Sequence, residues 1–357
     1  MLARGNFTLE KVRQLQAETK RDPALLERVI YAFGLLEALS LVGLEFIFKG
    51  GTCLMLLLDK PKRLSTDIDI IVEPGTDIDD YIEKASEIFP FVSVEEQNRS
   101  KVRNIEKRHF MFYYASPVNG DTFHIILDVV FEDGHYSSTV QKEIANSLLD
   151  IELPSTYVTV PTLNGILGDK LTAFAPHTIG IRFGEKKELE IIKQFYDIAT
   201  LMDEMDDFEE VKATYEQTAA VEIEYRALQN IGIKETLLDS FHAAISIISK
   251  GTLFQNDYSY LLDGMRRIKN HIFDSFSPVV AEAQACQVAY LIANVLADSK
   301  TLPRIADVDS YADMIIAYPF FAKLNFVKRS SLTNFAYLYE AIKLYETVNI
   351  APSGRWP

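Results

Sequence analysis

Two aspartates stand two residues apart inside an apolar run, in the stretch RLSTDIDIIV at positions 63–72. Side chains at positions i and i+2 of a β-strand point to the same face, so Asp67 and Asp69 should project together. Mg²⁺ is commonly held by one or two protein carboxylates together with substrate phosphates. The spacing therefore predicts a metal-binding pair for phosphoryl chemistry. The alternative is a pair of surface aspartates on an edge strand.

A glycine pair precedes the aspartates, in the stretch KGGT at positions 49–52. Gly50 and Gly51 end one apolar run, and Thr52 stands near the start of a short helical segment. Glycines allow backbone N–H groups at a helix start to come close to a phosphate. A strand, a glycine turn, a helix and an aspartate pair in this order suit metal-dependent chemistry on a nucleoside triphosphate.

Asp128 is the next candidate, because it is the only acid in the apolar run HIILDVVF. Burying a carboxylate without a partner is costly, so some partner is expected. If its strand lies beside Asp67 and Asp69, Asp128 becomes a third metal ligand or the base for an acceptor hydroxyl. The alternative is a structural pair with an arginine.

Two residues further along could complete such a site. Lys170, in the helical pattern LNGILGDKLTAF, could reach a phosphate as a point charge. The alternative for Lys170 is a solvated helix lysine. Asp197 lies on a helix beside Phe195 and Tyr196, and by itself it is unremarkable.

A short basic stretch interrupts an otherwise acidic chain, whose net charge is −15. That charge argues against a general nucleic-acid-coating protein. The stretch could contact the backbone of a nucleic-acid acceptor, or it could be a solvated hairpin or loop. Its cations are Arg99, Lys101, Arg103, Lys107 and Arg108. The histidines show no ligand spacing, and GxSxG, Walker and kinase motifs are absent, which disfavours hydrolases, P-loop proteins and kinases.

These residues need a mixed set of elements to position them. The patterns predict helices at 8–20, 23–42, 52–58, 77–89 and 139–149, and strands at 44–49, 68–72, 91–94, 110–115, 123–131 and 157–160. From about residue 162 the chain is expected to be almost wholly helical. Asp22-Pro23 is typical of a helix start, and Gly43 of a helix end. We therefore expect an α+β domain over 1–155 and a helical domain over 156–357.

Composition predicts a cytoplasmic location. The 357 residues are 48% hydrophobic, enough for a sizeable core, and include only Cys53 and Cys286, which suits a reducing compartment. The N-terminal stretch lacks the apolar core of a signal peptide. Val29 to Phe48 is apolar enough for a membrane span, but Glu37, Glu45 and Gly43 interrupt it. We expect a buried helix followed by a buried strand there, and no membrane contact.

The combination K-G-G-T-x-L at 49–54 and R-x-S-x-D-x-D at 63–69 resembles the AbiEii/AbiGii toxin family of nucleotidyltransferases. That family belongs to the DNA polymerase β-like superfamily and includes toxins of type IV toxin–antitoxin systems. The motifs GDKLTAF around Lys170 and FYDIATL around Asp197 also resemble the family, so the likeness spans about residues 8–205. Lys193 and Gln194 stand where the family often has Arg-Asp.

The resemblance implies a polymerase β-like mixed sheet with flanking helices, followed by a helical bundle. It implies catalytic roles for Asp67, Asp69, Lys170 and Asp197, with Mg²⁺ at the two aspartates of 67 and 69. Asp128, which matches the family by its position in a strand, is expected to be catalytic and the third metal ligand. The nucleotide-binding residues that it implies are Gly50, Gly51, Thr52, Arg63, Ser65 and Lys170.

The function implied is Mg²⁺-dependent transfer of a nucleoside monophosphate from an NTP to an acceptor hydroxyl, with a tRNA 3′ end as the leading acceptor. A cognate antitoxin is the expected partner. Two alternatives stay open. One is transfer to a small molecule or a protein hydroxyl, and the other is a non-catalytic nucleotide-binding module.

Overall fold

The computed structural model describes residues 1–97 and 106–348 of the chain. The chain folds into two compact units. The first, the sheet unit, consists of Met1–Thr162 with Asn270–Asp274, and the second, the helical unit, contains Leu163–Lys269 and the chain from Ser275 onward.

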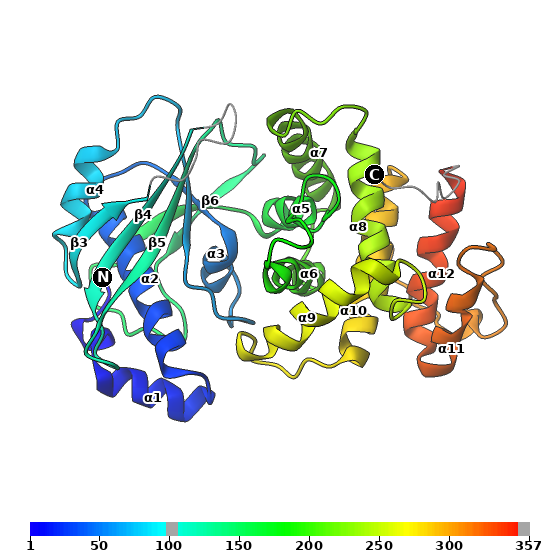
Figure 1. Cartoon of the computed structure of the whole chain (residues 1–357), viewed down its shortest axis with the longest axis horizontal. Coiled ribbons are helices and arrows are strands. Elements are labelled where there is room, and N and C mark those ends of the chain that lie inside the picture. The colour runs from blue at the N-terminus through cyan, green and yellow to red at the C-terminus, as the bar shows by residue number, and fades with distance from the viewer. Residues whose placement is uncertain (98–105, 349–357) are drawn as a thin grey trace. The chain divides into compact units, whose positions relative to one another are not determined.

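The sheet unit contains a seven-stranded sheet in the order β3-β4-β5-β2-β1-β7-β6. Its strands are β1 Ile47–Lys49, β2 Ile68–Val72, β3 Phe91–Glu96, β4 Glu106–Ala115, β5 Thr122–Phe131, β6 Thr139–Glu143 and β7 Tyr157–Pro161. Its helices are the 3₁₀ turn η1 Arg4–Phe7, α1 Leu9–Thr19, α2 Pro23–Leu41, α3 Gly50–Leu57 and α4 Asp79–Ser86. Figure 1 shows these elements in blue to green.

The sheet is mixed. Strand β2 runs parallel to β5 and antiparallel to β1, and β1 runs parallel to β7. The remaining neighbours pair antiparallel. The fold is thus α+β, as the sequence predicted.

One face of the sheet forms the core. Phe48, Ile70 and Leu127 are fully buried on neighbouring strands, and the apolar helix α2 packs against β2 and β5. Because side chains alternate along a strand, the residues next to them, Lys49 and Asp69, lie on the opposite face, where they are half-buried. We call this second face, which carries Asp128 as well, the polar face of the sheet.

Helix α2 begins as predicted. The Asp22 carboxylate accepts a hydrogen bond from the Leu25 N–H at 2.9 Å, and Pro23 occupies the first helical turn. Gly43 follows the last turn with φ +79°, a conformation that glycine adopts without strain. Most of α2 is buried, which confirms the prediction of a core helix at this position.

The helix predicted at 139–149 is wrong. Residues Thr139–Glu143 form β6, which pairs antiparallel with β7 from Thr139↔Pro161 to Glu143↔Tyr157. Strand β6 lies at the sheet edge, and its residues are exposed or half-buried, so their apolar spacing carries little information. Pairing with a neighbouring strand overrides the local helical pattern.

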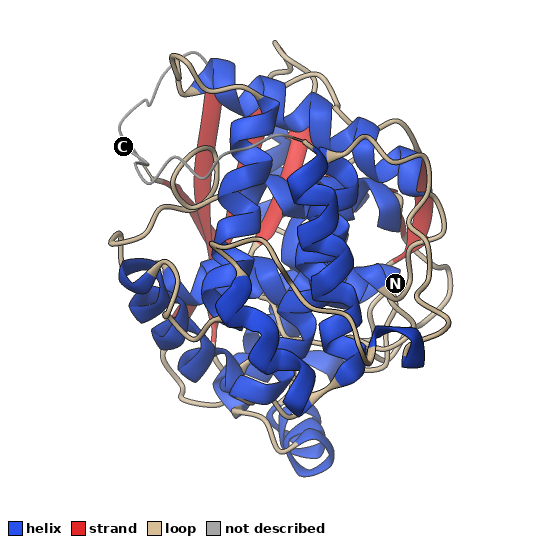
Figure 2. Ribbon diagram, turned by 90° about the vertical axis from the view of Figure 1, so that its right-hand side faces the viewer, coloured by secondary structure: helices blue, strands red, loops and turns tan. Residues whose placement is uncertain are grey.

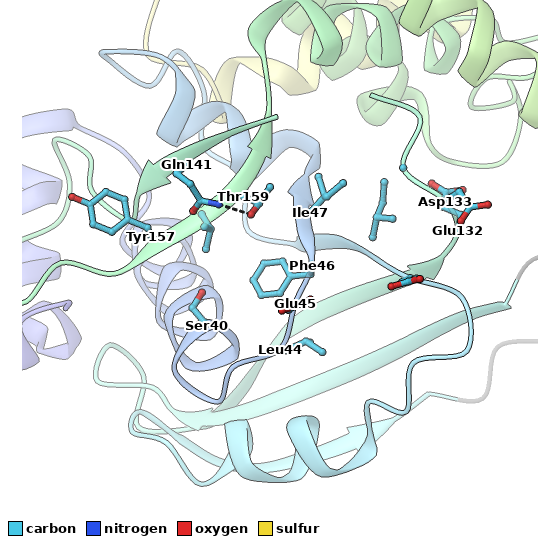
Figure 3. Close-up of a pocket in the computed structure, with 14 residues that line it drawn as sticks. Ser40, Leu44, Glu45, Phe46, Ile47, Glu132, Asp133, Gln141, Tyr157 and Thr159 are labelled. Atoms are coloured by element: carbon cyan, nitrogen blue, oxygen red, sulfur yellow. Dashed lines mark hydrogen bonds between the residues drawn. The ribbon is translucent and has the colours of Figure 1, made fainter. Parts of the chain in front are cut away.

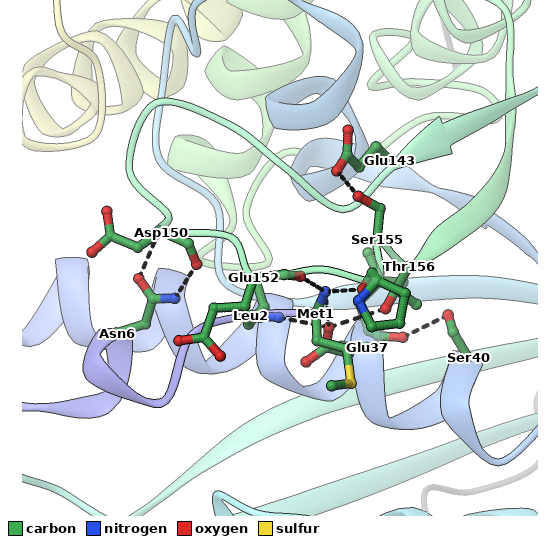
Figure 4. A network of polar contacts seen from close by, with 12 residues as sticks. Met1, Leu2, Asn6, Glu37, Ser40, Glu143, Asp150, Glu152, Ser155 and Thr156 are labelled. Atoms are coloured by element: carbon green, nitrogen blue, oxygen red, sulfur yellow. Dashed lines mark hydrogen bonds and ion pairs between the residues drawn. The ribbon is translucent and has the colours of Figure 1, made fainter.

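Polar contacts tie the first residues to the segment before β7 (Figure 4). The Leu2 N–H and the Thr156 hydroxyl both donate to Glu37, at 2.8 and 3.2 Å. Asn6 and Asp150 exchange two hydrogen bonds, at 2.7 and 2.9 Å. Glu37, one of the acids that argue against a membrane span, is therefore satisfied inside the sheet unit.

The helical unit contains no strand among its described residues (Figure 2). Its α-helices are α5 Leu163–Ala173, α6 Glu188–Met202, α7 Phe208–Tyr225, α8 Ile233–Ile248, α9 Gln255–Arg267, α10 Pro278–Leu296, α11 Val327–Ser330 and α12 Leu332–Thr347. Its 3₁₀ turns include η3 Asp309–Tyr311 and η4 Ala322–Phe326, and η2 Ile268–Asn270 runs from this unit into the sheet unit. Within the described chain, α10 alone has the length and apolar composition of a membrane span, and 67% of it is buried.

Candidate nucleotide and metal site

The glycine turn lies directly against Asp69. Lys49, the last residue of β1, is the register partner of Asp69 on β2, and Gly50 follows with φ +82°. A Cβ on Gly50 would overlap the Asp69 carboxylate. Helix α3 begins at Gly50, two residues earlier than predicted. Glycine at this position therefore allows a carboxylate and the start of a helix to meet.

Gly51 lies against two further residues of the predicted set. A Cβ on Gly51 would meet the Arg63 guanidinium and would lie 2.8 Å from the Ser65 hydroxyl oxygen. Arg63 is only 5% exposed and donates a hydrogen bond to the Leu64 carbonyl at 3.3 Å. Its backbone also forms a β-bridge with Ile272. Arg63 and Ser65 therefore lie against the glycine turn, and their role in phosphate binding stays a prediction.

Thr52 holds the backbone before β2. Its hydroxyl donates to the Asp67 carbonyl at 2.6 Å, and the residue is fully buried. Asp67 itself is exposed and precedes the first residue of β2. The contact of Thr52 thus fixes where Asp67 emerges from the sheet.

Asp128 lies beside Asp69. Strands β2 and β5 run parallel with these two aspartates as register partners, so their Cα atoms are about 5 Å apart. The Asp128 side chain is 31% exposed, and its Oδ1 contacts Nδ1 of His109 on β4. The sequence offered an arginine as the alternative partner, and the structure provides a histidine. Sequence reasoning missed His109, whose signal was the register of the β4–β5 hairpin.

The donor set of this site suits a hard divalent cation. Carboxylate oxygens are the ligands that Mg²⁺ prefers, and Mg²⁺ normally fills its remaining positions with phosphates and waters. Within 1–97 and 106–348, no group of three or more acidic, histidine or cysteine side chains is arranged so that it could hold a metal ion by itself. Asp69 and Asp128 fit a cation that arrives with a triphosphate, and the three-aspartate set stays a prediction.

Lys49 links the glycine turn to an acid that the sequence did not single out. Its ammonium lies 3.9 Å from Glu132, which follows β5 and also pairs with His135 at 3.3 Å. Burial would raise the pKa of Glu132, but the hydrogen bond from His135 and the charge of Lys49 outweigh it and hold the pKa below its usual value. Glu132 is therefore a buried, ionised neighbour of the glycine turn.

A cavity of about 530 Å³ opens on the polar face of the sheet (Figure 3). Ile47 and Ile71 form part of the cavity wall. Ile47 lies two residues before Lys49 on β1, and Ile71 lies two residues after Asp69 on β2. Among the residues that the structure describes, the cavity lining includes four acids and no basic side chain; the acids are Glu45, Glu73, Glu132 and Asp133. Figure 3 shows Glu132 and Asp133 together, apart from Tyr157. The lining favours a ligand that carries positive charge.

Lys170 and Asp197 meet inside the helical unit. The Lys170 ammonium, on α5, lies 3.1 Å from the Asp197 carboxylate on α6 and donates to Gln194 at 2.9 Å. Lys170 is 5% exposed and Asp197 2%, so the alternative of a solvated lysine does not hold. These two residues belong to a different compact unit from the aspartates and glycines above.

The basic stretch is described only at its C-terminal end, because Arg99, Lys101 and Arg103 lie outside the described residues. Arg108 pairs with Asp79 at 2.6 Å and with Glu96 at 2.8 Å. The hydrogen bond with Arg108 lowers the pKa of Glu96, despite partial burial. The charge of Arg108 is therefore matched by the protein's own acids.

Comparisons with known proteins address the family. The family model described as "Nucleotidyl transferase AbiEii toxin, Type IV TA system" matches residues 34–271, more than half of the chain. A candidate nucleotidyltransferase from Helicobacter pylori has a similar crystal structure, with TM-score 0.43 and 13% identity, covering 78% of this chain and 99% of that one. JHP933, also from H. pylori, gives TM-score 0.34 and 16% identity over 68% and 97%. A search of curated proteins finds no match.

Proposed function

The chain belongs to the AbiEii family of nucleotidyltransferases, the toxins of type IV toxin–antitoxin systems, and we propose that it transfers a nucleoside monophosphate from an NTP–Mg²⁺ complex to a tRNA 3′ end. The observation that supports this most is the Asp69 carboxylate lying on the Gly50 turn, with Asp128 beside it. The arrangement puts carboxylates for a cation next to backbone N–H groups for phosphate.

Each residue of the site has a separate role in this proposal. Asp67 and Asp69 hold Mg²⁺, with Asp128 as third ligand or as the base for the acceptor hydroxyl. A bound Mg²⁺ neutralises triphosphate charge and aligns the reacting oxygens. The first turn of α3 and Ser65 bind phosphate oxygens, and the acceptor oxygen displaces pyrophosphate from the α-phosphorus. Positioning and charge neutralisation supply most of the rate enhancement.

Lys170 is proposed to contact the nucleotide phosphates from the helical unit. Its pair with Asp197 would hold the ammonium in one place until a phosphate competes for it. A cognate antitoxin and a cytoplasmic location complete the proposal. They rest on the family and on the small number of cysteines in the sequence, Cys53 and Cys286.

The direct test is label transfer. The protein is incubated with α-³²P-labelled NTPs, Mg²⁺ and total tRNA, and the RNA is separated on a gel. We expect label at the 3′ end of tRNA, and none with the Asp69→Asn variant. If the folded wild-type protein leaves all RNA unlabelled, the tRNA acceptor is wrong.

A second acceptor class is favoured by the cavity beside Lys49. Its described lining residues include four carboxylates and no cation, which suits a small hydroxyl compound that carries amines, such as an amino sugar. In the same assay, an amino-sugar mixture would then take up label while tRNA does not. Glu73→Gln should raise the KM for the amino sugar, whereas Glu87→Gln, which lies outside the cavity lining, should leave it unchanged.

A further inference from the structure

His109 and Asp128 form a cross-strand pair on the polar face of the sheet. They are register partners on β4 and β5, and the His109 ring nitrogen Nδ1 contacts Asp128 Oδ1. Both side chains are partly exposed, at 18% and 31%. No other hydrogen bond or ion pair of the Asp128 side chain exists within the described part of the chain. Its second oxygen is therefore available to a ligand.

The pair lies next to Asp69, in a fixed order across three strands. His109 on β4 faces Asp128 on β5, and Asp128 is the register partner of Asp69 on β2. Partners on adjacent strands point to the same side of the sheet. A cation bound by Asp69 is thus one strand away from Asp128, and His109 lies on the far side of Asp128 from it.

An aspartate that binds a cation from this position needs a hydrogen-bond donor that fixes the orientation of its carboxylate plane. The terminal torsion of an aspartate side chain is broad, so an unsupported carboxylate samples many orientations. A ring N–H that donates to one oxygen restricts that torsion. Such partners of metal-binding carboxylates commonly tune affinity or activity by about 10–100-fold.

We propose that His109 is a positioning residue that holds Asp128 as the third carboxylate for the divalent cation of the nucleotidyl-transfer site. This inference rests on the proposed function, because it needs a cation at Asp69. It assigns His109 no contact with substrate. The opposite assignment, in which Asp128 orients His109 as the base, predicts a different response to substitution.

The test compares three variants of the full chain. His109→Ala removes the donor, whereas His109→Asn keeps a side-chain N–H donor near the position of Nδ1 but cannot act as a base. The matched control is His124→Ala, because His124 lies on β5, the strand of Asp128, and contacts Tyr113 rather than an acid. Affinity for Mn²⁺ with a non-hydrolysable NTP is measured by calorimetry, followed by kcat and KM and by thermal unfolding.

We expect His109→Ala to weaken Mn²⁺ binding and to lower kcat by about 10–100-fold, with the KM for NTP and the melting temperature unchanged. His109→Asn should recover both within about threefold, and His124→Ala should match the wild type. Unchanged Mn²⁺ affinity in His109→Ala overturns the proposal, even if kcat falls. Equal losses in the Asn and Ala variants also overturn it, since they indicate that His109 is the base.

The Asp69→Asn variant separates this inference from the proposed function. If Asp69→Asn binds Mn²⁺ and transfers label like the wild type, the metal site itself is wrong, and His109 has nothing to position. If Asp69→Asn loses both while His109→Ala keeps both, the site is right and only the role of His109 is wrong.

Discussion

The candidate acids of the sheet unit and the Lys170–Asp197 pair of the helical unit differ in their exposure to solvent. In the sheet unit, Asp67 is exposed just before β2, and the Asp128 side chain is 31% exposed on the polar face of the sheet. In the helical unit, Lys170 and Asp197 are almost fully buried and satisfy each other. Asp239 is buried there too, and accepts hydrogen bonds from the His177 N–H and the Thr178 hydroxyl.

This difference separates residues whose substitution should leave the fold intact from residues that the fold depends on. An exposed carboxylate stays ionised and can meet a cation without a large change in solvation. A buried ion pair loses its hydration on folding, and removing one partner leaves an uncompensated charge in the interior. Substitution of the exposed acids in the sheet unit should therefore change activity at constant stability, whereas substitution within the buried pair of the helical unit should change stability first.

The largest effect is expected at Asp67. Asp67→Ala should lower transfer activity by roughly a thousandfold or more, because a metal carboxylate contributes several kcal/mol to the transition state. It should also abolish toxicity in cells. The free energy of unfolding should stay within about 0.5 kcal/mol, as for other exposed positions. Label transfer, growth assays and urea unfolding measure these three outcomes, and a folded, toxic variant would falsify the metal assignment.

Substitution in the Lys170–Asp197 pair should have the opposite effect, a loss of stability. Lys170→Met leaves Asp197 buried without its cation and should cost about 3–5 kcal/mol of unfolding free energy. The double variant Lys170→Met/Asp197→Leu removes both charges and should recover most of that loss. Urea unfolding followed by circular dichroism measures both. If the single variant is as stable as the wild type, the pair is not a structural element of the helical unit.

The elements around the site were largely predictable from local patterns. Strand 68–72 and the Asp22-Pro23 helix start have strong local signals, an apolar run in one case and a cap in the other. The helix predicted at 139–149 failed because β6 is stabilised by pairing with β7, which is distant information. Local sequence does not encode which edge strand finds a partner.

The contacts of the candidate site were less predictable. The apolar pattern placed the start of a strand at Phe110, whereas β4 begins at Glu106, so His109 was left outside the strand that pairs it with Asp128. Lys170 and Asp197 were each weak signals alone, and only the packing of α5 on α6 brings them together. The candidate residues could be predicted from the sequence, but their contact partners could not, because these depend on strand register and helix packing.

The pH dependence of stability tests the buried titratable groups of the helical unit. Burial lowers the pKa of His242 to about 4. A depressed folded-state pKa contributes stability that is complete above the unfolded value near 6.5 and is lost as the pH falls through 4. The wild type should therefore lose about 3 kcal/mol of unfolding free energy as the pH falls from 6.5 to 4, and His242→Phe should not show this loss.

Asp239 provides a control of opposite sign in the same helix. Burial raises its pKa to about 6, so its stability contribution is complete below the unfolded value near 3.8 and is lost as the pH rises through 6. The wild type should lose about 3 kcal/mol of unfolding free energy from this group as the pH rises, and Asp239→Asn should remove that loss. Urea unfolding from pH 4 to 7 compares the slopes. If unfolding free energy changes with pH at the same slope in the two variants, the pKa shifts assigned to His242 and Asp239 are wrong.

Among the substitutions expected to destabilise the fold, Gly50→Ala should have the smallest effect, and it separates backbone strain from the contact with Asp69. Gly50 and Gly75 have φ values of +82° and +83°, and a Cβ on Gly75 would meet no atom within 4 Å. Alanine at either position should cost about 1–2 kcal/mol of unfolding free energy from the left-handed backbone alone. Gly50→Ala must also displace the Asp69 carboxylate, so it should reduce Mn²⁺ affinity and label transfer, whereas Gly75→Ala should not. Equal activity in the two variants would mean that the glycine turn serves the backbone alone and that Asp69 does not depend on it.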